Sequence, residues 1–207
     1  MSFKPILIVA GEPNSIFLEI FFKSIKQNKY KSPLIIIVSK HLLLRQMKEL
    51  GFRYKINLID KNHINFNNLD NKTINIIDVS FVFKNTFDQI SSKSNAYISK
   101  SFDIALELIK KNKLSKFING PISKKYFLKG DFLGITEYLA KRTNRTGQVA
   151  MLIYNKKLAV SPITTHLPLK DVHKNLSKKK IISQINLIKK FYIKNFKKNP
   201  KVGITGL

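Results

Sequence analysis

The sequence predicts an α/β fold, a doubly wound and mainly parallel sheet with helices on both faces. Short continuous apolar runs at 6–10 and 34–38 are typical of parallel strands that are buried on both faces. Segments with apolar residues at helical spacing lie between such runs, most clearly over 94–111. Because strands and helices alternate without an internal repeat or a low-complexity linker, one continuous α/β architecture is favoured over an all-β or all-helical one.

The expected strands lie mainly in the first part of the chain. They fall at 6–10, 34–38, 56–59, 74–79 and 117–118, and those starting at Ile6, Leu34, Ile74 and Phe117 are predicted to share one mixed, mainly parallel sheet. The Asn-rich stretch 60–72 is expected to be a loop. Farther along, 149–154 and 158–161 predict an antiparallel hairpin, and 201–205 predicts the start of one more strand.

Helices are predicted where a capping side chain precedes a periodic apolar pattern. Asn14 is expected to cap a first helix, and Ser39 a second that ends at Gly51. Ser177 is expected to cap a long basic helix. The expected buried stripe of that helix is Ile181, Ile185, Ile188, Tyr192 and Phe196. The spacing also predicts a short helix over 136–141.

The composition is that of a globular chain with a basic surface. Hydrophobic residues make up 43% of the 207 residues, which is enough for a core. With 38 basic and 12 acidic residues, the formal net charge is +26. The lysines are spread along the whole chain, and only four residues are arginine, the side chain suited to base and phosphate recognition. We therefore expect a solvated surface and no nucleic-acid partner, with a basic nucleic-acid-binding protein as the alternative that the charge raises.

Several absences from the sequence narrow the function classes. The chain has no cysteine, which excludes disulfides, thiolate catalysis and cysteine-ligated zinc. It has no apolar stretch of about 18 residues and no signal-peptide pattern, so we expect no membrane span and a cytoplasmic location. The G-x-G-x-x-G, phosphate-loop, G-x-S-x-G and H-E-x-x-H patterns are also absent.

Three segments carry the candidate chemistry. His166 follows the apolar run 158–163, which is expected to be a buried strand, so its imidazole is placed to be a fixed metal ligand. Thr136 stands at an expected helix start, where its hydroxyl can bond a substrate oxygen or serve as an ordinary helix cap. Lys124 closes the segment Asn119-Gly120-Pro121-Ile122-Ser123-Lys124 and is either a cation for a carboxylate or phosphate or one more solvated lysine.

The order and spacing of these segments resemble the 4-hydroxythreonine-4-phosphate dehydrogenase family of vitamin B6 biosynthesis. The resemblance begins at Gly11-Glu12-Pro13 and includes Thr164-Thr165-His166-Leu167-Pro168-Leu169. It covers nearly the whole chain and ends at 202–207, where the family continues with an Asn-Pro-His-Ala-Gly-Glu segment and many further residues. The resemblance therefore implies that these residues are the N-terminal portion of a longer dehydrogenase, as a fragment or a truncated copy.

The resemblance also implies a particular form of the α/β fold. It is the isopropylmalate-dehydrogenase-like form, with two α/β domains around a cleft. The first domain would span 1–133, and 134–207 would be the start of a second, incomplete domain. Family members are homodimers with active sites at the subunit interface, so a homodimer is the implied assembly.

His166 is the metal ligand that the resemblance implies. In the family, the histidine of this segment is one of three that bind a divalent metal, which here would be zinc, magnesium or cobalt. The other two family histidines lie beyond the last residue of this sequence. The remaining histidines, His41, His63 and His173, match no ligand position. A single imidazole does not hold a metal tightly, so we expect no competent metal site in these residues alone.

Substrate contacts are implied at three further positions. Thr136 matches the threonine of the family's Gly-His-Thr-Glu pattern, and Lys124 matches the lysine of its Pro-Ile-x-Lys segment. Ile135 replaces the family histidine, and its side chain can neither donate a hydrogen bond nor move a proton. This departure leaves open an altered substrate, a relaxed function or a decayed copy. No residue is assigned to the cofactor.

The function implied by the resemblance is NAD- or NADP-dependent oxidation of a small phosphorylated substrate, 4-phosphohydroxy-L-threonine. The product would be a 2-amino-3-oxo acid phosphate that loses carbon dioxide on the route to pyridoxal phosphate. The alternatives are a related dehydrogenase of a phosphorylated sugar acid or a dihydrodiol, and a non-catalytic remnant.

Overall fold

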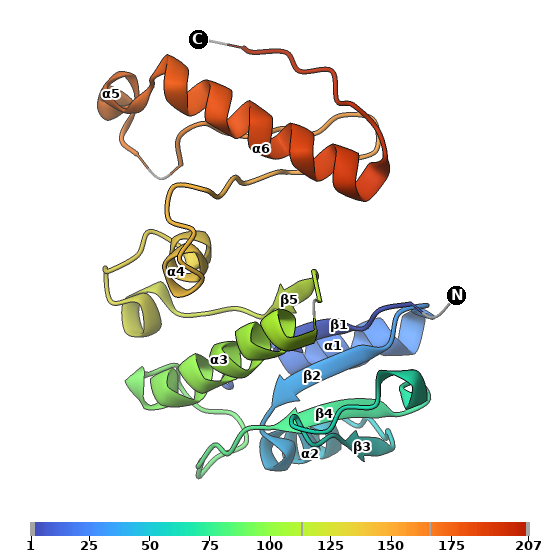
Figure 1. The fold of residues 1–207 in the computed structure, drawn as a ribbon. Helices are drawn as coiled ribbons and strands as arrows, with labels where there is room; N and C mark the ends of the chain where they lie inside the picture. Colours follow the sequence, from blue (N-terminus) through green and yellow to red (C-terminus); the bar gives the residue numbers. More distant parts are fainter. Residues whose placement is uncertain (1–2, 113, 166, 206–207) are drawn as a thin grey trace. The chain divides into compact units, whose positions relative to one another are not determined.

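The structure, a computed structural model, describes residues 3–112, 114–165 and 167–205. The chain forms two compact units, Met1–Gly130 and Asp131–Leu207 (Figure 1). The predicted domain limits, 1–133 and 134–207, stay a prediction. Among the described residues, none of the helices combines the length and the apolar character that a membrane crossing requires.

The first unit is built on a five-stranded sheet in the order β3-β4-β2-β1-β5. The strands are β1 (Ile6–Val9), β2 (Leu34–Val38), β3 (Ile56–Leu58), β4 (Ile74–Asp78) and β5 (Phe117–Asn119). All four pairings between neighbouring strands are parallel. The predicted sheet is therefore confirmed, and it is wholly parallel where a mixed sheet was expected.

The apolar runs lie in the middle of this sheet, as their composition predicts. β1 and β2 pair in the register Leu7↔Ile35 and Val9↔Ile37, and all four of these side chains are fully buried. Both faces of the two strands are covered, so neither strand needs polar residues on alternate positions.

Helices cover both faces of the sheet, which confirms the doubly wound arrangement. Figure 1 shows α3 (Asn95–Asn112) on one face, and α1 (Phe17–Gln27) and α2 (Lys40–Glu49) on the other. The α1–α2 layer and the strands share one core, in which Phe22 and Leu43 are fully buried. Three short elements complete the unit: the 3-10 helices η1 (Phe66–Asn68) and η2 (Ser92–Ser94) and the π-helical turn η3 (Lys124–Leu128). Of these, η1 lies within the stretch 60–72, which was expected to be a loop.

The two helix caps expected in the first unit give one confirmation and one correction. Ser39 caps α2, since its hydroxyl accepts from the Leu42 backbone N–H at 3.4 Å. The prediction for Asn14 is wrong: α1 begins only at Phe17, and Asn14 instead donates its backbone N–H to the Glu12 carboxylate at 3.3 Å. The Ser15 hydroxyl accepts from the Phe17 N–H at 3.3 Å, so the turn held by Glu12 delays the helix.

Gly120 lies at a close crossing of two backbone segments in the first unit. Its N–H donates to the Val9 carbonyl at 2.7 Å, and a Cβ on Gly120 would stand 2.0 Å from the Ala10 carbonyl oxygen. No side chain fits without moving β5 away from β1.

We expect Gly120→Ala to lower the free energy of unfolding by about 3 kcal/mol. This value is in the upper part of the range for overpacking, because the added Cβ would force the backbone of β5 away from β1. Urea unfolding followed by circular dichroism measures this. The matched control is Gly203→Ala, which meets nothing within 4 Å, and it should change stability by less than about 0.5 kcal/mol. Equal effects of the two changes would contradict this account of the crossing.

The regular structure of the second unit is mainly helical in its described residues, with long irregular segments and one isolated antiparallel bridge. Its helices are α4 (Ile135–Arg142), α5 (Leu169–Val172), the 3-10 turn η4 (His173–Asn175) and α6 (Lys178–Phe196). The predicted short helix and the predicted long basic helix are both confirmed. Ser177 caps α6, because its hydroxyl accepts from the Lys180 N–H at 3.2 Å.

The strand predictions in this unit are mostly wrong. The expected hairpin is reduced to one antiparallel bridge between Ile153 and Val160, and no described part of 158–163 forms a buried strand. Leu158 is 71% exposed and Val160 53% exposed. The stretch 201–205 has no strand structure either. A strand needs a neighbour along its length, and the described residues of this unit offer only the one bridge.

The apolar stripe of α6 is also less covered than predicted. Its residues have the expected spacing, but none of them is buried and Phe196 is 36% exposed. The aromatic members pack on the hairpin instead, with the Tyr154 and Phe196 rings stacked at 5.0 Å between centroids. Periodicity identified the helix correctly and overstated its burial.

Candidate functional site

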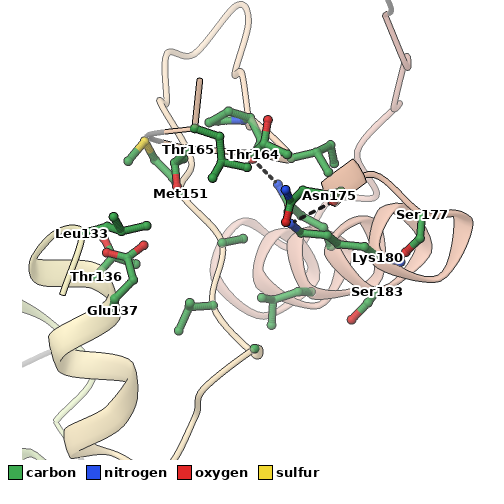
Figure 2. A pocket seen from close by; sticks show the side chains of 18 of the residues that line it. Leu133, Thr136, Glu137, Met151, Thr164, Thr165, Asn175, Ser177, Lys180 and Ser183 are labelled. Atoms are coloured by element: carbon green, nitrogen blue, oxygen red, sulfur yellow. Dashed lines mark hydrogen bonds between the residues drawn. The ribbon is translucent and has the colours of Figure 1, made fainter. Parts of the chain in front are cut away.

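A cavity of about 570 Å³ lies within the second unit, and segments distant in sequence form its walls. Figure 2 shows Thr136 and Glu137 on α4 facing the cavity from one side, Thr164 and Thr165 from another, and Lys180 on α6. The remaining lining residues are Leu133, Gly147, Val149, Ala150, Met151, Pro162, Ile163, Leu167, Asn175, Ser177, Lys179, Ser183, Gln184 and Leu187. The cavity therefore joins the segment around Thr136 to the segment around position 166.

The start of α4 sets the direction of the Thr136 side chain. Gly134 is the N-cap, in an extended conformation with φ −166°, and it has no side chain with which to cap the helix. Thr136 is therefore not the cap, and its hydroxyl belongs to the first turn, on the cavity wall. Ile135 is half-buried and does not line the cavity.

Hydrogen bonds fix the opposite wall. The Gln184 amide on α6 donates to the Ser161 hydroxyl and to the Pro162 carbonyl, both at 2.8 Å. The Ser161 hydroxyl donates in turn to the Met151 carbonyl at 2.6 Å. These bonds join the hairpin to α6 just before the Thr164–Thr165 pair. The Lys180 ammonium donates to the Asn175 carbonyl at 3.3 Å, which holds its stem along the first turn of α6.

The lining chemistry suits a small polar molecule with negative charge. Hydroxyl groups come from Thr136, Thr164, Thr165, Ser177 and Ser183, and ammonium groups from Lys179 and Lys180. Glu137 is the acidic residue of the lining. Hydroxyls and ammonium groups can bind phosphate or carboxylate oxygens, while the apolar side chains exclude water from part of the site.

The α6 contribution to this cavity was not predicted from the sequence. The residues at 179–180, 183–184 and 187 recur at three- and four-residue spacing, so they share one helix face. That spacing could have shown a polar face beside the apolar stripe. Nothing in the sequence places that face against Thr136, because the two segments are joined only through tertiary structure.

His166, the predicted metal ligand, lies outside the described residues. Its neighbours Thr165 and Leu167 both line the cavity. Within residues 3–112, 114–165 and 167–205, no three histidine, aspartate or glutamate side chains come together to hold a metal ion. The described side chains therefore do not form a metal site by themselves, and the role of His166 stays a prediction.

Lys124, the other predicted substrate contact, belongs to the first unit. It begins η3, where the preceding Ser123 hydroxyl accepts from the Tyr126 N–H at 3.1 Å, and its side chain is exposed. Thr136 belongs to the second unit. The expected approach of Lys124, Thr136 and His166 around one cleft stays a prediction.

Glu12 is a buried carboxylate at the end of β1, and it joins separate loops of the first unit. It accepts from the Ser94 hydroxyl at 2.8 Å, while its own N–H donates to the Pro121 carbonyl at 2.8 Å. Burial raises the pKa of the Glu12 carboxyl above 4.5, and the hydrogen bonds from Ser94 and Asn14 oppose this rise. Glu12 thus fixes the loops at the carboxyl ends of β1 and β5, where open α/β sheets bind ligands.

The raised pKa predicts how pH affects the stability of the first unit. The folded state takes up a proton at Glu12 more readily than the unfolded state does. The stability from this group is therefore fully present below the unfolded value of 4.5 and is lost as pH rises through the raised folded pKa. We expect the stability of the parent chain relative to Glu12→Gln to fall over the interval from the unfolded value of 4.5 up through the raised folded pKa. Urea unfolding of both proteins at each pH measures this, and a relative stability that rises over that interval would contradict the sign.

Comparison with known proteins identifies relatives over almost the whole chain. The family model described as "Pyridoxal phosphate biosynthetic protein PdxA" matches residues 29–207. A 4-hydroxythreonine-4-phosphate dehydrogenase of Sulfurihydrogenibium sp. is 32% identical over 205 residues, which are 97% of this chain and 62% of that protein. The enzyme of the same name from Aquifex aeolicus is 29% identical over 99% of this chain and 62% of that protein. The chain thus spans about three fifths of the length of these curated relatives.

Solved structures show the same fold. The crystal structure of a 4-hydroxythreonine-4-phosphate dehydrogenase from Burkholderia phymatum superposes with a TM-score of 0.77, covering 93% of this chain and 59% of the other at 22% identity. A terephthalate 1,2-cis-dihydrodiol dehydrogenase from Burkholderia xenovorans superposes with a TM-score of 0.59 at 15% identity. Since the family model covers residues 29–207, this chain belongs to the PdxA family of pyridoxal phosphate biosynthetic proteins.

Proposed function

We propose that these residues form the N-terminal part of an NAD- or NADP-dependent, divalent-metal-dependent dehydrogenase that oxidises 4-phosphohydroxy-L-threonine. The product is a 2-amino-3-oxo acid phosphate that decarboxylates, in pyridoxal phosphate biosynthesis. One observation carries the proposal: a single cavity is lined both by Thr136 and by Thr164, Thr165 and Leu167, the described neighbours of position 166. Relatives that match almost the whole of this chain are named 4-hydroxythreonine-4-phosphate dehydrogenase.

The cavity has the size and the donors that such a substrate needs. A volume of about 570 Å³ lies within the range of small-molecule sites. The substrate carries a phosphate, a carboxylate, an amine and a hydroxyl. Thr136 and the Thr164–Thr165 pair offer hydroxyl donors to its oxygens, Lys180 offers a cation to an anionic group, and Glu137 offers a carboxylate to the amine.

The divalent metal and the nicotinamide cofactor are proposed only because the chain belongs to this family. A bound divalent metal supplies a Lewis acid for the substrate oxygens, and the cofactor accepts the hydride. The described side chains do not make a metal site, so no step of the reaction is assigned to one here. His166 is proposed as a ligand that needs further ligands from outside the described residues. No described residue is assigned to the cofactor. A homodimer and a cytoplasmic location are proposed on the same basis of family membership.

A second candidate function rests on Ile135 and on the fold comparison. Ile135 removes the imidazole that the family pattern places beside Thr136, and a dihydrodiol dehydrogenase shares the fold. The alternative is a related dehydrogenase that acts on a dihydrodiol or on a phosphorylated sugar acid. Because Ile135 does not line the cavity, the described site keeps its polar lining despite the substitution.

Substitution of Thr136 tests the proposed site. Thr136→Val keeps the shape of the side chain and removes the hydroxyl. We expect the affinity for 4-phosphohydroxy-L-threonine to fall by about tenfold, because the substrate would lose one hydrogen bond to a charged group. Isothermal titration calorimetry on residues 1–207 measures the change. The matched control is Thr143→Val at the other end of α4, outside the cavity, which should leave affinity within about twofold. Equal affinities of Thr136→Val and the parent chain would remove Thr136 from the site.

A further inference from the structure

A second groove, of about 1010 Å³, lies in the first unit and carries an excess of positive charge. Its lining includes the cationic side chains Arg45, Lys48, Arg53 and Lys55, together with His41. The other lining residues are Leu44, Met47, Gly51, Phe52 and Tyr54, so no acidic residue lines the groove. Two of the four arginines of the chain gather here, whereas the lysines are spread over every segment.

The local fold brings these charges to one groove from two segments, α2 and the stretch 52–55. Arg45 and Lys48 are neighbours on the exposed face of α2, three residues apart. After α2 the chain turns at Gly51, with φ +72°, so that 52–55 runs back along the helix. In this extended stretch Arg53 and Lys55 are exposed, while Phe52 and Tyr54, which alternate with them, are half-buried.

The stretch 52–55, which lines the groove beside α2, is held in place by contacts with the core and with β4. The Phe52 ring lies 5.3 Å from the Phe22 ring, and the Tyr54 hydroxyl donates to the Phe22 carbonyl at 3.2 Å. The Phe52 N–H donates to the Met47 carbonyl at 2.9 Å, and the Lys55 carbonyl accepts from the Ile74 N–H at 2.9 Å. The guanidinium and ammonium groups therefore project from a fixed backbone.

The positive charges of this groove are not neutralised by the described part of the chain. Arg45, Lys48, Arg53 and Lys55 take part in none of its ion pairs. Glu49, the acidic residue of α2, accepts a hydrogen bond from the Thr86 hydroxyl and does not line the groove. Four like charges around one hollow repel one another, and a multiply charged anion would remove that repulsion.

We propose that this groove binds a small anion with several phosphate groups, of the size of a nucleoside triphosphate. Guanidinium groups bind phosphate oxygens in a bidentate manner, and the two arginines line the same groove from two different segments, so one chain of phosphates can contact both. The lining also includes Leu44, Met47 and Phe52, apolar surface that suits a nucleobase. The four charged side chains line one groove, which favours a small ligand over a nucleic acid.

Calorimetric titration of residues 1–207 with ATP, and separately with inorganic tripolyphosphate, tests this proposal. Three proteins are compared at one fixed ionic strength: the parent chain, Arg45→Gln/Arg53→Gln, and Lys100→Gln/Lys110→Gln. The last carries the same loss of charge on exposed positions of α3. We expect saturable binding of one ATP per chain, weakened at least about tenfold by the arginine pair and less than about twofold by the lysine pair.

The outcomes decide between the possible origins of binding. Equal affinities for ATP and tripolyphosphate would support a phosphate site, and tighter binding of ATP would support the same site with a nucleobase contact. Absence of saturable binding would overturn the proposal. Equal weakening by the two double variants would also overturn it, since net charge alone would then explain the binding. A single-stranded oligonucleotide that binds through Arg45 and Arg53 and more tightly than ATP would replace the small anion with a nucleic acid.

Discussion

Replacing Phe22 by alanine should lower the free energy of unfolding of the first unit by about 4 kcal/mol, the middle of the range for a buried phenylalanine. Phe22 is fully buried on α1, and its ring lies among those of Phe21, Phe52 and Tyr54, with centroids 5.9, 5.3 and 6.2 Å away. Deletion removes apolar burial and leaves a cavity that a parallel sheet and two helices cannot close. Urea unfolding followed by circular dichroism measures the loss.

The control for this change is Phe87→Ala. Phe87 belongs to the same unit, but it is 48% exposed, so its removal should cost less than about 1 kcal/mol. A loss below about 1 kcal/mol for Phe22→Ala would contradict the core as described. The same core holds Phe52 and Tyr54, so Phe22→Ala should also weaken the proposed binding of ATP in the groove lined by Arg45 and Arg53.

Residues 1–207 alone should form no measurable reduced cofactor when supplied with NAD or NADP, 4-phosphohydroxy-L-threonine and zinc, magnesium or cobalt. His166 offers one imidazole, and in the described residues no group of three ligating side chains is present. A single ligand does not hold a catalytic metal, and Ile135 offers no proton donor beside Thr136. We expect the rate to be at least about a thousandfold below that of the Sulfurihydrogenibium relative in the same assay.

The control adds the part of that relative which this chain does not match. The match covers 62% of the relative, so the remaining portion can be produced separately and mixed with residues 1–207. Turnover that appears only in the mixture would support the proposed division of the active site. Turnover by residues 1–207 alone at the rate of the relative would show that the chain holds a complete catalytic site.

The first unit could be predicted closely because its strands are buried on both faces. A continuous apolar run such as 34–38 has few alternatives when it lies between amphipathic helices. The expectation for Asn14 is wrong because the buried carboxylate of Glu12 accepts from its backbone N–H, and Glu12 also accepts a tertiary hydrogen bond from Ser94. The residue type alone shows that Asn14 is able to cap a helix. Whether a helix begins there depends on the tertiary contacts of the surrounding turn.

The second unit was predicted less well, for a related reason. The apolar run 158–163 and the stripe of α6 both indicate surfaces that pack on something, but periodicity does not say on what. The role of Thr136 was suggested by a motif, and its place on a cavity wall emerges from the fold. Lys180 and Glu137 could not be assigned to the site from the sequence. Lys180 lies on α6 and Glu137 on α4, and only the tertiary structure brings both to the lining of one cavity.

The claim that the cavity of the second unit binds the phosphorylated substrate is tested most directly by nuclear magnetic resonance. Amide shifts of ¹⁵N-labelled residues 1–207 are followed during titration with 4-phosphohydroxy-L-threonine, with and without zinc. The account predicts saturable shift changes at Thr136, Thr164, Thr165 and Lys180, all of which line the cavity, and an affinity about tenfold weaker for the same titration in Thr136→Val. Shift changes that leave these residues unmoved, or that survive Thr136→Val unchanged, would contradict it.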